Sequence, residues 1–310
     1  MIKYQLSKED LEYLAQYSIE KYERPSVTAD IAVFAVNKET AEEGASEAER
    51  KANYRKDPVR ELQVLLVKRG ACPFQNRWAM PGGFSIKEES GQETALRELH
   101  EETGVGDAYL RPFGVFSKPG RDPRGWIISH GYLALIDGEK YRLHAGADAW
   151  EAAWFRLSVR STEQSRRVLE NGTVTEYLHE LHFYQSERDI EFTAKVMEIR
   201  RFSGLHGHVE LEILDAGELA FDHAELLLSA WQMLRRETEG SGRIIFDLMP
   251  EKFTLNALQK AFELVLGREL LVANFRRKIA PLVVETDEEI TGVGHRPAKL
   301  FKRNPEEFFR

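Results

Sequence analysis

Cysteine is almost absent from this chain of 310 residues. The single cysteine, Cys72, excludes an intrachain disulfide and any cysteine-rich zinc site, and such usage is typical of a reducing cytoplasm. Apolar runs are also short, because none approaches the ~20 residues that a membrane-spanning helix needs. The first ten residues have neither a basic region nor a long apolar stretch, so we expect no secretion signal. We therefore expect a cytoplasmic protein without membrane contact.

Positive charge is in short supply overall, and it is unevenly distributed. The net charge is −8, yet residues 251–310 hold 11 Lys or Arg against 9 Asp or Glu. Residues 1–250 therefore carry a net charge of about −10. This balance argues against a protein that is basic all over. A mildly basic C-terminal module on an acidic body is consistent with local contact to nucleic acid. The length itself favours two domains.

The N-terminal half contains several strand-like runs. Residues 8–22 have the apolar spacing of a short amphipathic helix. Residues 37–61 are polar and aperiodic, as in an exposed loop insertion. Runs rich in β-branched and aromatic residues predict strands at residues 29–36, 62–68, 111–116 and 127–136. We assign residues 1–157 to a first domain.

Residues 158–220 are predicted to be rich in β-structure. Residues 176–184, 190–199 and 209–214 alternate like strands, whereas residues 163–169 favour a helix. His179 and His182, like His206 and His208, have metal-like spacing, but no cysteine or clear carboxylate completes a zinc site. Ordinary surface or packing histidines are the simpler interpretation. We interpret the segment as an insertion or extension of the first domain.

Residues 83–105 carry the strongest functional signal. Glu98, Glu101 and Glu102 are spaced i, i+3 and i+4, so they share one face of a helix. Like charges at this spacing destabilise a helix unless a cation lies between them. Carboxylate oxygens suit hard divalent cations such as Mg²⁺ or Mn²⁺. Gly104 suits the left-handed residue that ends a helix. The pattern therefore predicts a metal site on a helix.

The same segment is similar to the Nudix hydrolase signature, G-x5-E-x7-R-E-U-x-E-E-x-G-U with U apolar, and matches it at every position. Chance agreement is expected at roughly 10⁻⁶ per chain. The resemblance implies an α+β fold, an α/β/α sandwich with a mixed sheet. Glu98 and Glu102 would be the main metal ligands and Glu101 a further ligand or a base. Arg97 and Glu89 would brace these glutamates. The implied chemistry is metal-assisted water attack on a phosphorus atom, although such a fold can also bind without hydrolysis.

Residues around this segment are candidates for ligand binding. Gly82 and Gly83 let the backbone approach a ligand closely. A proline 15 residues past the last signature glycine resembles the pattern of Nudix proteins that handle ADP-ribose. Arg121 and Arg124, which follow that proline, are suited to pair with phosphate or ribose groups, although a surface turn with solvated arginines is equally consistent. The resemblance favours ADP-ribose over a nucleoside triphosphate.

Residues 221–310 predict a linker helix and a winged helix-turn-helix. The linker helix covers residues 222–236, and Thr254 can cap a second helix that Gly267 ends. A third helix at residues 272–279 is followed by strands at 282–285 and 298–302, around a glycine-rich tip at 291–297. In such a domain we expect base edges of DNA to be contacted by Asn274, Arg276 and Arg277. We expect DNA phosphates to be contacted by Lys278, Arg296 and Lys299.

This order of modules resembles the Nudix-related transcriptional regulators of bacterial NAD metabolism. The resemblance rests on the signature, on the segments Phe221-Asp222-His223-Ala224-Glu225 and Phe253-Thr254-Leu255, and on residues 274–278. It implies a homodimer that senses ADP-ribose and binds a palindromic operator in double-stranded DNA. Two alternatives remain. One is a magnesium-dependent ADP-ribose or nucleotide-sugar pyrophosphatase whose C-terminal module only dimerises, and the other is a regulator of this type that responds to a sugar.

Overall fold

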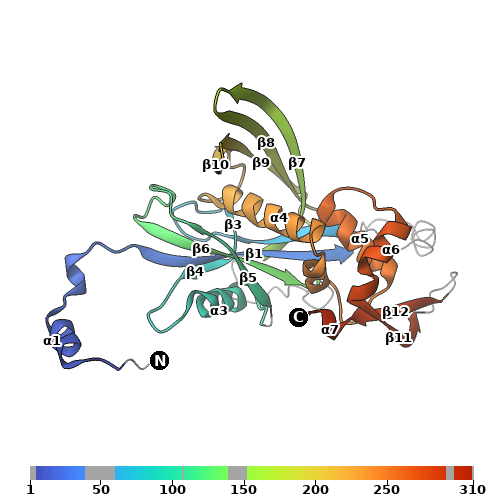
Figure 1. Cartoon of the computed structure of the whole chain (residues 1–310), viewed down its shortest axis with the longest axis horizontal. Coiled ribbons are helices and arrows are strands. Elements are labelled where there is room, and N and C mark those ends of the chain that lie inside the picture. Colours follow the sequence, from blue (N-terminus) through green and yellow to red (C-terminus); the bar gives the residue numbers. More distant parts are fainter. Residues whose placement is uncertain (1–4, 39–59, 107, 139–151, 291–296, 309–310) are drawn as a thin grey trace.

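A computed structural model describes residues 5–38, 60–106, 108–138, 152–290 and 297–308 (Figure 1). The strands are β1 (Ser26–Lys38), β2 (Arg60–Lys68), β3 (Trp78–Ala79), β4 (Gly82–Phe84), β5 (Tyr109–Phe116), β6 (Ile127–Ile136), β7 (Ala152–Leu169), β8 (Gly172–Gln185), β9 (Ile190–Ser203), β10 (His206–Asp215), β11 (Val283–Ile290) and β12 (Ala298–Arg303). The helices are α1 (Lys8–Gln16), α3 (Gly91–Thr103), α4 (His223–Glu239), α5 (Leu255–Leu266), α6 (Val272–Ile279) and α7 (Pro305–Phe308), with 3-10 turns η1 (Ile19–Lys21), η2 (Arg243–Leu248) and η3 (Ala280–Leu282).

One large mixed sheet organises the N-terminal part of the molecule. Its strand order is β10-β9-β8-β7-β2-β1-β6-β5, with β3 paired to β2 and β4 paired to β1. β1 is parallel to β6 and antiparallel to β2, so the sheet is mixed as predicted. Residues 28–36 of β1 are buried, because both faces of the sheet are covered at this strand.

The two faces of the sheet carry separate apolar clusters. Ile31 and Val33 of β1 join the cluster that contains Leu99 of α3. Phe34, one residue further on, belongs to the other cluster, together with Leu227 of α4. Successive side chains of a strand point to opposite faces, so α3 and α4 cover opposite sides of the sheet (Figure 1). This is the expected α/β/α arrangement.

Residues 158–215 extend the same sheet. β7 runs without interruption from Ala152 to Leu169, so the helix predicted at residues 163–169 is wrong. Pairing with β8 continues as far as Leu169 opposite Gly172, and this ladder overrides the local helix propensity. The domain boundary predicted at 157/158 falls inside β7. The strands predicted further on are confirmed as β8, β9 and β10, and Figure 1 shows β7, β8 and β9 arching away from the body.

The C-terminal part is a winged helix, as predicted. The Thr254 hydroxyl accepts a hydrogen bond from the Ala257 N–H at 3.1 Å and caps α5. Gly267 ends α5 at a positive φ of 67°, and β11 pairs with β12 as the wing. α4 joins this part to the sheet, because one apolar cluster contains Phe34 of the sheet and Phe262 of α5. No described helix is long and apolar enough to cross a membrane.

A further predicted helix differs from the structure, and parts of two predicted segments lie outside the described residues. The helix predicted at residues 8–22 is divided into α1 and η1, and none of its residues is buried. In Figure 1 this segment stands away from the body. Residues 39–59 of the predicted loop and residues 291–296 of the wing tip, including Arg296, lie outside the described residues.

Candidate functional site

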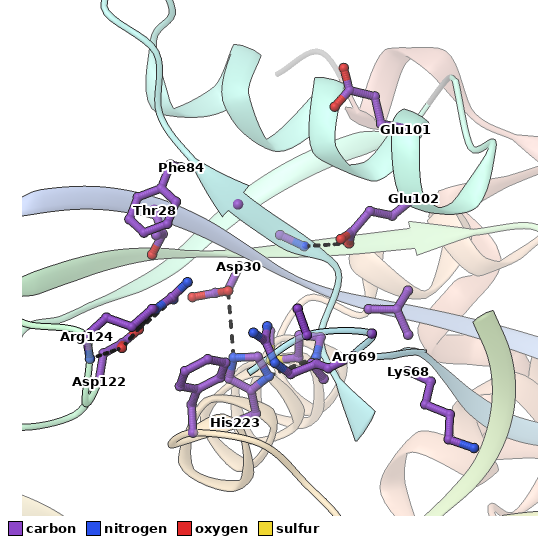
Figure 2. A pocket seen from close by; sticks show the side chains of 18 of the residues that line it. Thr28, Asp30, Lys68, Arg69, Phe84, Glu101, Glu102, Asp122, Arg124 and His223 are labelled. Atoms are coloured by element: carbon purple, nitrogen blue, oxygen red, sulfur yellow. Dashed lines mark hydrogen bonds and ion pairs between the residues drawn. The ribbon is translucent and has the colours of Figure 1, made fainter. Parts of the chain in front are cut away.

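A pocket of about 480 Å³ lies between α3 and the first turn of α4 (Figure 2). Strands β1 and β2, the two glycines of β4, the segment 121–124 and the start of α4 all contribute to its wall. The lining residues used below are Asp30, Arg69, Gly82, Glu102, Arg124, Phe221 and His223. The pocket therefore combines sequence-predicted residues with others that the tertiary fold brings to them.

Helix α3 holds the acidic residues at one side of this pocket. Ser90 and Glu93 form a capping box at its start, in which each side chain accepts a hydrogen bond from the other residue's N–H. Gly104 ends the helix in the left-handed conformation at φ 74°. Ala95 and Leu99 are fully buried against the sheet. Glu102 lies on the same side of α3 as these two residues, at i+7 from Ala95 and i+3 from Leu99, and it lines the pocket where the sheet ends beside the helix.

The glycines beside α3 allow two carboxylates to approach the backbone. The Gly82 N–H donates to the Glu102 carboxylate at 2.9 Å. A Cβ atom built on Gly83 would lie 2.3 Å from Glu98 Oε1, so a side chain there would displace that carboxylate. A Cβ on Gly82 would lie 2.3 Å from the carbonyl oxygen of Ala29. Both positions therefore require glycine for close packing.

Arg97 connects the acidic residues of this region. Its guanidinium donates to Glu89 at 2.9 Å, to Glu98 at 2.7 Å and to Glu101 at 3.1 Å, and also to the Phe84 carbonyl at 3.2 Å. The three predicted metal ligands are not equivalent. The Glu101 side chain is 57% exposed, and in Figure 2 it points away from Glu102.

Glu102 has an unusual environment for a carboxylate. Its pKa is raised to about 7, mainly by burial and also by the charges of Glu98 and Asp30, while the hydrogen bond from Gly82 lowers it. Asp30 is buried beside it, and burial likewise raises the Asp30 pKa although the Ser129 hydroxyl donates to it. Burial therefore raises the pKa of both carboxyl groups, although the charges of Arg121 and Arg124 at Asp30 and of Arg69 at Glu102 oppose it.

The two arginines expected to bind ligand differ in availability. The Arg121 side chain is only 5% exposed and forms a bidentate ion pair with Asp222, with both distances 2.7 Å. Arg124 is paired with Asp122 at 2.7 Å. Its guanidinium lies between two aromatic rings, 5.0 Å from the centroid of Phe84 and 5.0 Å from that of Phe221. Both arginines line the pocket, but the guanidinium of Arg121 is held by Asp222 at the start of α4.

Several pocket residues were not predicted as site residues. Arg69 follows the last residue of β2, and its guanidinium lies 4.6 Å from the centroid of the Phe221 ring. The Arg69 pKa is lowered mainly by burial and secondly by the charge of Arg124. His223 Nδ1 accepts the Met80 N–H at 2.9 Å, and burial lowers the His223 pKa to about 4. Its imidazole is therefore neutral at pH 7. No local motif marks Asp30 or Arg69, because they reach the pocket only through the sheet.

The candidate DNA contacts lie on α6 and on the wing. Phe275 and Ile279 are buried, and Asn274, Arg276 and Arg277 are exposed on the other side of α6. Arg277 donates to the Asn274 side-chain oxygen at 3.2 Å. Lys299 on β12 is paired with Glu285, which raises the Lys299 pKa. Lys278, in contrast, contacts the C-terminal end of α4.

Comparisons with known proteins agree with these two parts of the chain. Residues 56–178 match the NUDIX domain model, and residues 245–302 match the model of the NrtR DNA-binding winged helix domain. The chain is 28% identical to the ADPR responsive transcriptional repressor NtrR of Acinetobacter baylyi, over 94% of this chain and 86% of that protein. The chain therefore contains a Nudix domain followed by a winged helix domain of the NrtR type.

Solved structures share the whole architecture of this Nudix chain. A MutT/nudix family protein from Enterococcus faecalis is 27% identical with a TM-score of 0.65, over 96% of this chain and 93% of that one. Shewanella oneidensis NrtR, solved with a 27mer DNA, has 23% identity and a TM-score of 0.56, over 90% of this chain and 94% of that one. The latter shows that both have the same fold, a Nudix domain joined to a winged helix.

The Nudix pocket has donors that fit a divalent cation. Members of this family generally use such ions, and carboxylate oxygens are the ligands that Mg²⁺ prefers. Glu98 and Glu102 face the glycines of the pocket, and burial raises the Glu102 pKa. Among the described residues, no three His, Cys, Asp or Glu side chains are arranged as a complete metal site. Mg²⁺ commonly takes one or two carboxylates and completes its shell with water and phosphate oxygens.

Proposed function

We propose that this chain is a transcriptional regulator of NAD metabolism. In this proposal the Nudix pocket binds ADP-ribose, and the winged helix of a homodimer binds a palindromic operator. The observation that carries the proposal is that one helix, α4, forms part of the pocket wall at its start and packs against the winged helix further on. The similarity to an ADPR responsive repressor along 94% of the chain supports it.

The chemistry of the pocket supports a nucleoside diphosphate as ligand. Arg69 and Arg124 supply two guanidinium groups, which suit phosphate oxygens. Phe84 and Phe221 supply aromatic rings on which a planar base can stack. A neutral sugar needs neither group, so this pocket favours ADP-ribose over the sugar alternative.

A second activity, hydrolysis of the diphosphate linkage of ADP-ribose, is supported by the position of the signature carboxylates. Glu98 and Glu102 would hold Mg²⁺ or Mn²⁺, and Arg97 would fix Glu98 while Glu89 fixes Arg97. When bound, the metal supplies charge neutralisation on the diphosphate and activation of water. Glu101 is exposed and would act as a further ligand or a base only after turning toward the ligand.

On the DNA side, the proposal assigns base reading to α6. Asn274, Arg276 and Arg277 are exposed on the face opposite the buried residues of α6, and they suit adenine or guanine edges. Lys299 is suited to a phosphate once released from Glu285. The half-sites of a dimer's operator would lie about one helical turn, or a small multiple of turns, apart.

The proposal is tested by ligand-induced stabilisation and by DNA selection. ADP-ribose at ~100 times its dissociation constant should stabilise the protein by ~2.7 kcal/mol, seen as a rise in melting temperature. A shift with ribose or another sugar but none with millimolar ADP-ribose and Mg²⁺ would favour the sugar-responsive regulator. Fragments selected from random DNA should contain a palindrome. Binding no tighter than ~10⁻⁵ M at physiological salt, the non-specific range, would favour the pyrophosphatase with a dimerising module.

A further inference from the structure

Lys278 lies against the end of α4, although its sequence position suggested a phosphate contact. Its ammonium group donates to the carbonyl oxygens of Thr238 at 3.3 Å and Glu239 at 3.0 Å. The same group lies 5.8 Å from the centroid of the Phe262 ring in α5. Lys278 therefore connects α6, which carries the candidate base contacts, with both α4 and α5.

These contacts complete the C-terminal end of α4. The last four carbonyl groups of an α-helix have no partner inside the helix. In α4, two of the four accept from the backbone N–H groups of Gly240 and Gly242, each at 3.0 Å. The other two, those of Thr238 and Glu239, accept from Lys278. Thr238 is fully buried, and a cation also suits the negative end of a helix dipole.

The opposite end of α4 forms part of the pocket wall. Asp222, the residue before the helix, is held by the bidentate ion pair with Arg121. His223 accepts the Met80 N–H from the pocket floor. Phe221 adopts a positive φ of 52°, which is strained for an aromatic residue and is typical of functional positions. A ligand that contacts Phe221 or Arg124 therefore acts directly on the start of α4.

Between its two ends α4 has little freedom to move independently. It has 17 residues, and at 1.5 Å per residue it is about 25 Å long. Leu226, Leu227 and Leu234 are fully buried in the apolar cluster that reaches from the sheet to α5 and α6. A close-packed helix of this kind shifts as a unit.

We propose that Lys278 is a positioning residue that couples the pocket to α6. Occupancy of the pocket shifts the start of α4, and the ammonium group, which is bound to the last turn of α4, carries that shift to Asn274, Arg276 and Arg277. The proposal rests on the proposed function, because it requires that a ligand of the Nudix pocket alters DNA binding. It adds that this effect requires the hydrogen-bonded contact between α4 and α6, in addition to the apolar cluster that the two helices share.

The experiment compares full-length wild type with Lys278→Met and Lys278→Arg. The dissociation constant for a DNA fragment selected by the wild type is measured by fluorescence anisotropy, with and without saturating ADP-ribose. The ratio of the two constants measures the coupling, which is typically about 5- to 150-fold between linked sites. We expect a ratio near one for Lys278→Met, partial recovery for Lys278→Arg, and unchanged ADP-ribose affinity of the DNA-free proteins.

Lys252→Met is the matched control. Lys252 belongs to the same winged helix domain but is paired with Glu288 at 2.5 Å, so the control removes an equal charge without uncapping α4. It should keep the wild-type ratio. A wild-type ratio in Lys278→Met would overturn the coupling role. If ADP-ribose leaves wild-type DNA binding unchanged, the proposed function fails instead.

A second measurement needs neither ligand nor operator. Hydrogen exchange should become faster in the last turn of α4 and in α6 of Lys278→Met, and Lys278→Arg should restore protection. Unchanged exchange would show that the contact does not hold the two helices together. Loss of all DNA binding by Lys278→Met, combined with wild-type exchange, would assign Lys278 to a phosphate and would also overturn the proposal.

Discussion

Replacing Glu102 by glutamine should stabilise the metal-free protein above neutral pH. The glutamine keeps an oxygen that can accept the Gly82 N–H, which the carboxylate accepts at 2.9 Å, and it removes a charge that burial disfavours. The same change should abolish magnesium-dependent hydrolysis of ADP-ribose, because a ligand charge is lost. Stability and activity are therefore expected to change in opposite directions.

The size of the effect follows from the pKa of Glu102. It rises from 4.5 to about 7 in the folded protein, and at 1.36 kcal/mol per pKa unit this is at most about 3 kcal/mol. The gain should be greatest above pH 7, where the native carboxylate is ionised. It should decline as the pH falls from 7 to 4.5, because the native wild type takes up a proton that the unfolded chain does not yet bind. Below pH 4.5 it should disappear.

The assay is urea unfolding in EDTA at pH 8 and at pH 5, with free energies extrapolated to water. Glu101→Gln is the control, since this neighbour on α3 is 57% exposed and its ion pair with Arg97 is a surface contact worth at most about 1 kcal/mol. Adding Mg²⁺ should narrow the difference between wild type and Glu102→Gln. A Glu102→Gln protein that is less stable than wild type at pH 8, or equally stable at both pH values, would refute the reasoning.

Three further changes test other parts of the structure. Burial lowers the His223 pKa to about 4, so this residue contributes stability above pH 6.5 that is lost as the pH falls toward 4. His223→Asn should reduce this loss in the free energy of unfolding by up to about 3 kcal/mol. If the variant loses as much stability as the wild type between pH 6.5 and 4, the neutral buried His223 is not its cause. Gly83→Ala should weaken Mg²⁺-dependent stabilisation by ADP-ribose, because the added Cβ would lie 2.3 Å from Glu98 Oε1. Gly106→Ala, whose Cβ would have an ordinary contact at 3.6 Å, should behave as wild type in the same thermal assay. Arg277→Ala should cost about 1–3 kcal/mol on the selected operator and much less on random DNA, and an equal loss on both would contradict base reading.

The sequence alone specified the local elements with strong patterns. Helix α3 follows from its capping box, its buried Leu99 and the left-handed Gly104, all of which are short-range features. The same holds for α5 between Thr254 and Gly267. Because the signature lies within one such helix and its preceding loop, the acidic part of the pocket could also be predicted.

Long-range strand pairing determined the secondary structure of residues 163–169, where local helix propensity gave the wrong prediction. Residues 163–169 contain good helix formers, but they lie opposite β8 in a strand ladder that begins inside the first domain. That ladder explains why residues 158–215 extend the sheet and why position 157/158 lies inside β7. Strand pairing of this kind depends on partners that a local window does not contain.

The rest of the pocket was also decided by the tertiary structure. Asp30, Arg69 and His223 come from β1, from the end of β2 and from α4, and no spacing rule links them in the sequence. Burial then sets their chemistry: it raises the pKa of Asp30 and lowers that of His223. The basic side chains illustrate the same point, since Arg121 and Lys278 looked like ligand and DNA contacts, whereas folding directs one to Asp222 and the other to the end of α4. The sequence determined which charges are present, and packing determined which of them remain available to a partner.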